Sequence, residues 1–168
     1  MARLARINVD TWRNAYVGIV PSAYLDGLDV RDFEDRWRER LTTDRPGISD
    51  WVAEVDAAVA GYAIVGPYRP QQDADPDEDP TGWGEVYALY THPALQGRGV
   101  GGAAHDAALG WLRDQGSRRA ALWVLRDNEA SRRWYARRGW GPDGVTSQWD
   151  DAGAALEEIR LVRDLEGN

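Results

Sequence analysis

The segment QGRGVGG, residues 96–102, indicates the architecture of this chain more clearly than any other stretch. It follows a predicted strand at 85–91 and opens a predicted helix at 99–115. Glycines let a backbone approach a ligand closely and leave its amides pointing outward. Amides at a helix N-terminus favour an anion, because they carry partial positive charge. A phosphate or pyrophosphate is therefore the expected ligand. A ligand-free turn is the alternative, but it would need fewer glycines.

Two other nucleotide-binding motifs are excluded at this loop. Gly97, Gly99 and Gly102 match the dinucleotide fingerprint G-x-G-x-x-G. That fingerprint follows its strand directly, whereas residues 92–96 intervene here, and the acidic residue that should end the next strand, Asp114, falls inside the predicted helix. Too little chain remains for further βαβ units. A Walker loop needs lysine, and all 20 basic residues of this chain are arginines.

Composition excludes several function classes. The length of 168 residues predicts one domain that can bury a core without a disulfide or a structural metal. The absence of cysteine excludes thiolate nucleophiles and cysteine-ligated metals. A net charge of -8 argues against nucleic acid as a partner. No apolar run is long enough for a membrane span or a signal peptide, so a cytoplasmic protein without a membrane partner is expected.

Hydrophobic periodicity predicts a mixed α/β order of elements. Helices are expected at 4–19, from Ser22, at 29–41, 99–115 and 128–138, and strands at 50–56, 58–66, 85–91, 120–125, 145–150 and 155–164. Pro21 is expected to end the first helix, and Asp56-Ala57 to form a tight turn. Residues 67–82 hold four prolines and five acidic side chains, which predicts a mobile acidic loop. That loop lacks the ligand spacing of a calcium site, and no metal is expected.

Two motifs in this order resemble the GNAT superfamily, the acetyl-coenzyme A-dependent N-acetyltransferases. Gln96, Gly99 and Gly101 match its signature Q/R-x-x-G-x-G/A, and EVYALYTHP (85–93) is similar to its central strand. The run LWVLRDNEASRRWYARRGW (122–140) resembles its second cofactor motif. The resemblance covers about residues 50 to 165, and WRNAYVGIVPSAYL (12–25) is similar to the opening helices of bacterial small-molecule members.

The resemblance implies an α/β (α+β layered) fold, with one domain over 1–168. Its sheet would be mixed and mostly antiparallel, with a splayed central parallel pair and helices on both faces. Residues 1–42 would form the acceptor-side helices, and 50–165 the cofactor core. Family members usually begin with a strand before the first helix, whereas a helix is predicted here almost from Met1. Either the domain lacks this edge strand or its true start lies upstream. The departure concerns the sheet edge and oligomer contacts, and not the cofactor site.

The resemblance also implies acetyl-CoA as the acyl donor, bound in a V-shaped gap between 85–91 and 120–125. The pantetheine arm is expected on the backbone of Leu89 and Thr91, and Asn128 would either bond that arm or cap its own helix. The expected cofactor-binding residues are Leu89, Tyr90, Thr91, Gln96, Gly97, Arg98, Gly99, Val100, Gly101, Gly102, Asn128 and Ser131. Arginines 132, 133, 137 and 138 would reach the 3′-phosphate or form a solvated helix face.

The implied reaction is direct attack of an amine on the acetyl thioester. An alkylamine is mostly protonated at pH 7, and deprotonating it costs about 4.6 kcal/mol, so a base is useful. Glu85 is the candidate base; the alternatives are an exposed strand-edge carboxylate that only attracts a cation, and a water relay. Tyr135 is expected to protonate the departing thiolate, with a core aromatic as the alternative. His92 and His105 have no evident partner and no expected role.

The acceptor pocket is expected between the first helices and the C-terminal strands. Aromatic residues that could wall it are Trp12, Tyr16, Tyr24, Trp83, Tyr87 and Trp149, although aromatics can equally be core. The expected acceptor is a small-molecule amine. The alternatives are protein or peptide N-termini, or a non-catalytic acetyl-CoA-binding protein. Dimers are common in the family, so the resemblance also allows a homodimer.

Overall fold

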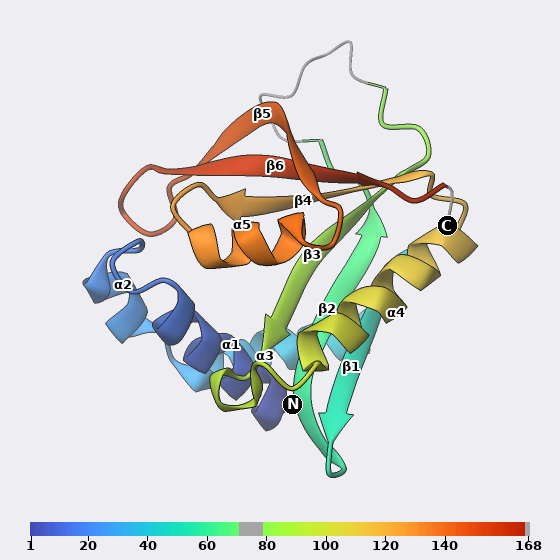
Figure 1. Cartoon of the computed structure of the whole chain (residues 1–168). Helices are drawn as coiled ribbons and strands as arrows, with labels where there is room; N and C mark the ends of the chain where they lie inside the picture. The colour runs from blue at the N-terminus through green and yellow to red at the C-terminus, as the bar shows by residue number, and fades with distance from the viewer. Residues whose placement is uncertain (71–78, 167–168) are drawn as a thin grey trace.

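A six-stranded sheet with helices on both faces organises the chain (Figure 1). The computed structural model describes residues 1–70 and 79–166. Its elements are α1 (Ala2–Ala15), α2 (Ser22–Gly27), α3 (Val30–Thr42), β1 (Ser49–Val55), β2 (Ala58–Pro67), β3 (Trp83–Thr91), η1 (Pro93–Leu95), α4 (Val100–Asp114), β4 (Arg119–Leu125), α5 (Glu129–Ala136), β5 (Gly141–Trp149) and β6 (Leu156–Asp164). None of the described helices combines the length and the apolar character that a bilayer span requires.

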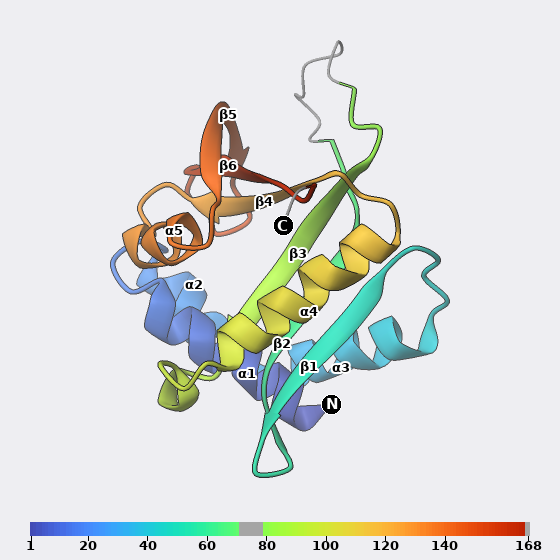
Figure 2. The same cartoon turned by 45° about the vertical axis from the view of Figure 1, so that its right-hand side comes forward.

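The strand order is β1-β2-β3-β4-β6-β5, and every neighbouring pair is antiparallel except β3–β4. The helices α1 and α3 cover one face of β1–β3, and α4 covers the other (Figure 2). This confirms the predicted mixed, mostly antiparallel sheet with helices on both faces.

The parallel pair β3–β4 is joined over a short distance only. Trp83, Gly84 and Glu85 pair with residues 119–121, and no further pairing follows. Residues 86–91 of β3 and 122–125 of β4 therefore diverge and form a fork. The two strand edges that face each other in this fork are not paired by backbone hydrogen bonds. This confirms the predicted splay and positions the candidate site.

Two main hydrophobic clusters lie on opposite faces of the sheet. Ala104, Ala108 and Leu112 of α4 pack with Leu122 and Ile159 of the sheet, which accounts for the helical apolar stripe predicted there. On the other face, residues of α1 and α3 pack on β2 and on partly buried residues of β3. Each helix is thus held mainly by burial of one face.

Some predicted boundaries are wrong. The first helix ends at Ala15 and not near Pro21. Gly18 lies in this interval with a φ of 76°, a conformation that a helix does not contain. The strand expected at 145–150 begins at Gly141, because an irregularity between Pro142 and Thr146 interrupts its alternation. The 3₁₀ turn η1 was not predicted.

Other predictions are confirmed. Asp56 and Ala57 both have positive φ, as a tight hairpin turn requires. Gly116 and Gly139 follow α4 and α5 in left-handed conformations. Of the predicted acidic loop 67–82, residues 71–78 lie outside the described part, and Tyr68 is buried.

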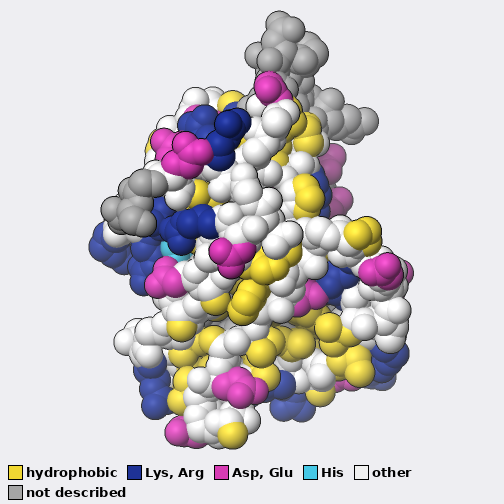
Figure 3. All heavy atoms as spheres, turned by 90° about the vertical axis from the view of Figure 1, so that its right-hand side faces the viewer, with side chains coloured by type: hydrophobic (Ala, Val, Ile, Leu, Met, Phe, Trp, Pro, Cys, Tyr) yellow, Lys and Arg dark blue, Asp and Glu magenta, His cyan; other side chains and the backbone are white. Residues whose placement is uncertain are grey.

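The strand β1 forms one edge of the sheet. It pairs with β2 on one side, and no other described strand pairs with it. On the face that carries α4 and β1, hydrophobic side chains gather over the lower half of the view (Figure 3), and Val52 of β1 is 52% exposed. α1 begins at Ala2, so among the described residues no strand precedes the first helix.

Candidate active site

The glycine loop presents free backbone amides at the start of α4. Gly97 and Gly99 have φ of 75° and 83°, conformations that favour glycine, and the space around both is open. Gly99 is the N-cap residue and offers no side chain to the first turn. The first N–H groups of a helix have no partner within it. This turn can therefore hold an anion by its backbone, as the sequence indicates.

A cation lies beside this turn. A Cβ atom placed on Gly102 would lie 3.1 Å from a terminal nitrogen of Arg138, whose guanidinium stacks on the Trp134 ring 3.7 Å from its centroid. Arg133 pairs instead with Glu129 at 2.7 Å, and Arg132 donates to the carbonyl oxygen of Arg126 at 2.9 Å. Of the arginines considered for the phosphate, Arg138 is the one that approaches the loop.

Asn128 caps α5. Its side-chain oxygen accepts a hydrogen bond of 3.1 Å from the amide of Ser131, and the residue is 4% exposed. The capping role that the sequence allows is therefore present. The side-chain nitrogen of Asn128 donates to no acceptor in the described part of the chain, so a ligand role is compatible with the cap.

Helix α1 is bonded along the open end of β3. The Thr11 hydroxyl donates to the carbonyl oxygen of Thr91 at 3.2 Å, and the Trp12 indole donates to the Tyr90 hydroxyl at 3.1 Å. One residue further, His92 Nε2 lies 3.3 Å from Asp10 Oδ2, a partner that the sequence did not reveal. These contacts fix α1 against the strand that leads into the glycine loop.

Tyr135 lies half-buried on α5, between two aromatic rings. Its ring centroid is 5.1 Å from that of Trp134 and 5.9 Å from that of Trp140. Burial raises the pKa of the phenol, and the nearby Tyr90 adds to the shift. No hydrogen bond engages the hydroxyl within the described residues. Tyr135 is thus protonated over the neutral range and free to donate.

Glu85 is buried and ion-paired. It is 2% exposed, at the point where β3 and β4 begin to diverge. Arg69 holds it through a terminal nitrogen 2.7 Å from Oε1 and through its backbone amide 2.9 Å from Oε2. The alternative of an exposed strand-edge carboxylate is therefore wrong. Both carboxylate oxygens of Glu85 are thus engaged by Arg69.

A second carboxylate was missed by the sequence reading. Glu158 of β6 is half-buried, and burial raises its pKa, with a further contribution from Glu85. Trp123 of β4 was likewise missed as a polar group: its buried indole nitrogen has no partner in the described part. Trp123 stands in an apolar run and Glu158 beside a second glutamate, and neither pattern distinguishes a core or surface position from a site.

Four of the six aromatic residues expected around the acceptor come together. Trp12 lies 4.9 Å from Tyr16, 5.9 Å from Tyr24 and 5.6 Å from Trp149, measured between ring centroids. These rings pack on one another with Val20, Leu25 and Leu125.

The other two aromatic residues lie apart from this cluster. Trp83 stacks with Arg119 at 4.6 Å and lies 5.4 Å from Tyr68. Tyr87 is covered by Arg69 at 3.7 Å.

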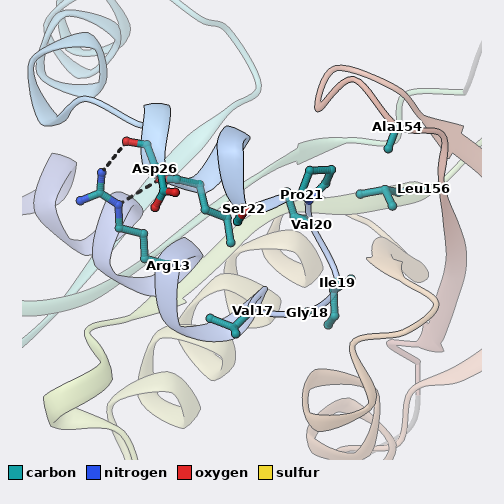
Figure 4. A pocket seen from close by; sticks show the side chains of 11 residues that line it. Arg13, Val17, Gly18, Ile19, Val20, Pro21, Ser22, Asp26, Ala154 and Leu156 are labelled. Carbon is teal, nitrogen blue, oxygen red and sulfur yellow. Dashed lines mark hydrogen bonds between the residues drawn. The ribbon is translucent and has the colours of Figure 1, made fainter.

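A pocket of about 520 Å³ (Figure 4) shares Val20, Leu25 and Leu156 with the hydrophobic cluster that contains these rings. It lies between the α1–α2 connection and the β5–β6 hairpin, the region where the acceptor is expected. Its lining is mostly aliphatic, with one arginine and one aspartate: Arg13, Val17, Gly18, Ile19, Val20, Pro21, Ser22, Leu25, Asp26, Ala154 and Leu156. The predicted aromatic residues are absent from this lining.

No group of three or more histidine, aspartate or glutamate side chains that could hold a metal ion occurs among the residues described.

Comparison with known proteins agrees with this geometry. The model of the acetyltransferase (GNAT) family matches residues 9–140. An uncharacterized N-acetyltransferase of Bacillus subtilis is 30% identical over 160 residues, which are 94% of this chain and 84% of that protein. A mycothiol acetyltransferase of Geodermatophilus obscurus is 29% identical over 82% of this chain and 53% of its own length, so the chain spans about half of that relative.

Solved structures share the fold at low identity. The PaiA N-acetyltransferase of Thermoplasma acidophilum, in complex with coenzyme A, aligns with a TM-score of 0.69 and 15% identity over 96% of this chain and 91% of that one. The ribosomal-protein-alanine N-acetyltransferase of Brucella melitensis aligns with a TM-score of 0.66 and 18% identity over 98% and 96% of the two chains. At such identities the likeness extends to the fold alone.

Proposed function

The chain belongs to the acetyltransferase (GNAT) family, and from this premise we propose that it moves an acetyl group from acetyl-CoA to the primary amine of a small molecule. Members of this family are acyltransferases that use acetyl-CoA. The observation that carries the proposal is the fork between β3 and β4, with the free amides of α4 at its open end.

The donor site follows from these elements. The pyrophosphate would lie on the amides of residues 97–102, beside the guanidinium of Arg138. The pantetheine arm would enter the fork along the unpaired edge of β3, near Leu89, Tyr90 and Thr91. The carbonyl of Thr91 already accepts from Thr11, so the backbone of Leu89 is the freer partner. Asn128 Nδ2 would donate to the same arm.

Catalysis would use direct attack of the amine on the thioester carbonyl carbon in a ternary complex. The C–N bond forms and the C–S bond breaks, and the departing sulfur takes a proton from Tyr135. Its raised pKa keeps that proton available at neutral pH. Gln96 and Arg98, both exposed at the loop, would contact the donor from the solvent side.

A small acceptor is supported by the size of the pocket beside the aromatic cluster. Its volume of about 520 Å³ suits a small molecule and not a folded chain. The ribosomal-protein-alanine acetyltransferase fold neighbour is the reason to keep a peptide N-terminus as a second candidate.

The test is release of free thiol from acetyl-CoA in the presence of an amine panel. The panel contains small alkylamines and short peptides with free N-termini. Turnover on small amines supports the proposal, and turnover confined to peptides contradicts it. Binding of acetyl-CoA without turnover would identify a non-catalytic binding protein. At 100 times its Kd, acetyl-CoA should add about 2.7 kcal/mol to the free energy of unfolding.

Two further expectations belong to the same proposal. The homodimer is tested by light scattering at several concentrations, where the edge strand β1 is a surface available for pairing. The cytoplasmic location is tested by fractionation of the native cells.

A further inference from the structure

Glu158 lies on the acceptor side of the fork and has no ion-pair partner in the described part of the chain. Glu158 pairs with Leu125 at the end of β4 and with Ser147 of β5. Residues opposite one another on neighbouring strands share a face of the sheet. Leu125 packs with Trp12 and Tyr16, so Glu158 faces α1, whereas Ile159 faces the α4 core.

This position lies at the open part of the fork. The β3–β4 pairing ends at Ala121, and Leu125 is four residues beyond it on β4. Glu85, by contrast, lies at the closed end, opposite Ala121. An acceptor that enters from the α1–α2 side would therefore meet Glu158 before it meets Glu85. The pocket residue Leu156 shares the strand face of Glu158.

The cations near this face are already engaged. Arg160 lies two residues further along β6, and its guanidinium bonds Asp143 at 2.8 Å and the Tyr68 hydroxyl at 2.6 Å. Arg13, which lines the pocket, donates to backbone carbonyls of α2, two of them drawn in Figure 4. Within the described residues, no basic side chain lies within ion-pair distance of Glu158. Its negative charge is thus available to a ligand.

Glu158 and Tyr135 approach the same two phenols. Burial raises the pKa of Tyr16 and of Tyr90, and the nearby Glu158 carboxylate adds to both shifts. Tyr135 adds to the shift of Tyr16, and Tyr90 adds to that of Tyr135. A carboxylate from β6 and a phenol from α5 therefore both lie near Tyr16 and Tyr90.

We propose that Glu158, and not Glu85, is the base that takes the proton from the acceptor ammonium. The role rests on the acetyltransferase function proposed above. The ammonium gives one proton to the Glu158 carboxylate and becomes a neutral amine, which attacks the thioester carbonyl carbon. As the C–S bond breaks, the sulfur receives a proton from Tyr135, and the second proton lost by the nitrogen restores the phenol. Glu158 then releases its proton to solvent.

Burial supports this role, because it brings the affinity of the carboxylate for a proton closer to that of an amine. The same negative charge would also select acceptors that arrive as cations. Glu85 keeps a different part in the site, as the buried anion that anchors Arg69 and the end of β2.

The test compares Glu158→Gln with Glu157→Gln on the full chain, with the best alkylamine from the panel. Glu157 is the adjacent residue, faces the other side of the strand and pairs with Arg126 at 2.7 Å, so its variant controls for loss of one carboxylate. Glu158→Gln should lower kcat/KM about 100-fold or more, the range for loss of a general base. Glu157→Gln should stay within about twofold of the wild type, as a surface change does.

A second acceptor separates proton transfer from a structural role. Hydroxylamine is mostly neutral at pH 7, unlike an alkylamine, and does not need to lose a proton before it attacks. With such an acceptor the loss in Glu158→Gln should shrink to less than about tenfold, since the base contributes only where a proton must be removed. An equal loss with both acceptors overturns the proposal.

Binding and folding controls keep the outcomes distinct. The Kd for acetyl-CoA should be unchanged in Glu158→Gln, and Glu158→Asp, which keeps a carboxylate, should recover most of the alkylamine activity even if the Gln variant folds poorly. Full activity of Glu158→Gln on the alkylamine refutes the role of Glu158 alone. A wild type that turns over no amine refutes the proposed function, and this role with it.

Discussion

Arg69 closes over Glu85 from the end of β2. Its guanidinium nitrogen lies 2.7 Å from Oε1, and its own backbone amide donates to Oε2 at 2.9 Å. The same guanidinium lies 3.7 Å from the centroid of the Tyr87 ring. A buried anion is thus neutralised by one side chain, and the chain that leaves β2 is tied to β3 at the closed end of the fork.

Replacement of Arg69 by Met should therefore destabilise the fold. It leaves Glu85 buried without a cation, which costs about 3–5 kcal/mol for a fully buried pair. The Arg69 side chain is 62% exposed, so we expect a smaller loss of about 1–3 kcal/mol. Urea unfolding measures it. The double variant Arg69→Met, Glu85→Gln should recover part of the loss, and an unchanged single variant would contradict this account.

His105 should make stability depend on pH. Its Nε2 accepts from the Trp140 indole at 3.0 Å, so the neutral ring carries its proton on Nδ1, 2.8 Å from Asp106. Burial lowers the pKa of His105 below its ordinary value near 6.5. The neutral His105 ring therefore contributes fully to the free energy of unfolding above pH 6.5. This contribution is lost as the pH falls toward the lower pKa of the folded state, and the free energy of unfolding then changes by at most about 1.4 kcal/mol per pH unit.

Unfolding curves at pH 7.5 and pH 5 measure this effect. His105→Gln is the control, because it removes the titrating group and leaves other titrations in place. The difference in the free energy of unfolding between the wild type and His105→Gln should become smaller as the pH falls. A constant difference would show that the protonation of His105 does not matter to folding.

Gly99, the N-cap of α4, and Gly110, inside that helix, should respond in opposite ways to replacement by alanine. Gly99 has a φ of 83°, so Gly99→Ala forces a left-handed conformation on a residue with a Cβ, at a cost of about 1–2 kcal/mol. It should also weaken acetyl-CoA binding. Gly110 lies inside the same helix with open space at its Cβ position, so Gly110→Ala should stabilise by about 0.5–1 kcal/mol. Thermal unfolding measures the two stability changes, and titration with acetyl-CoA measures binding. If both variants changed stability in the same direction, the backbone explanation would be refuted.

Tyr135→Phe should slow the reaction without changing donor binding. Phenylalanine keeps the ring contacts with Trp134 and Trp140 and removes only the hydroxyl. Loss of a general acid lowers kcat by about 100-fold or more. Steady-state kinetics and a direct acetyl-CoA titration measure the two effects. An unchanged kcat would remove Tyr135 from the chemistry.

The sequence carried most of the fold because its signals are local. Glycines at 97, 99, 116 and 139 mark turns that need positive φ, and the apolar stripe of α4 marks the face that packs on the sheet. Those patterns depend on backbone sterics and on burial of one helix face, both of which act within a few residues.

The site was harder to predict because it depends on distant contacts. Glu85 was a candidate base from the family resemblance, but its partner Arg69 comes from another strand end. Glu158 stands beside Glu157 in the sequence, and only the strand register separates the carboxylate that pairs with Arg126 from the one that faces α1. His92 and His105 show the same limit, since Asp10 and Trp140 are 82 and 35 residues away in the sequence.

The fork gives the sheet a mechanical property. Only three residue pairs register the leaf β1–β2–β3 with the leaf β4–β6–β5, so the two leaves are joined by a short hinge and not by a full ladder. An extended ligand arm seated on β3 would supply the missing hydrogen bonds much as an added strand does. Amide hydrogens on this edge should exchange quickly in the free protein and slowly with acetyl-CoA. Bound acetyl-CoA would then make the junction between the two halves of the sheet more rigid, and release of the product coenzyme A would make it flexible again.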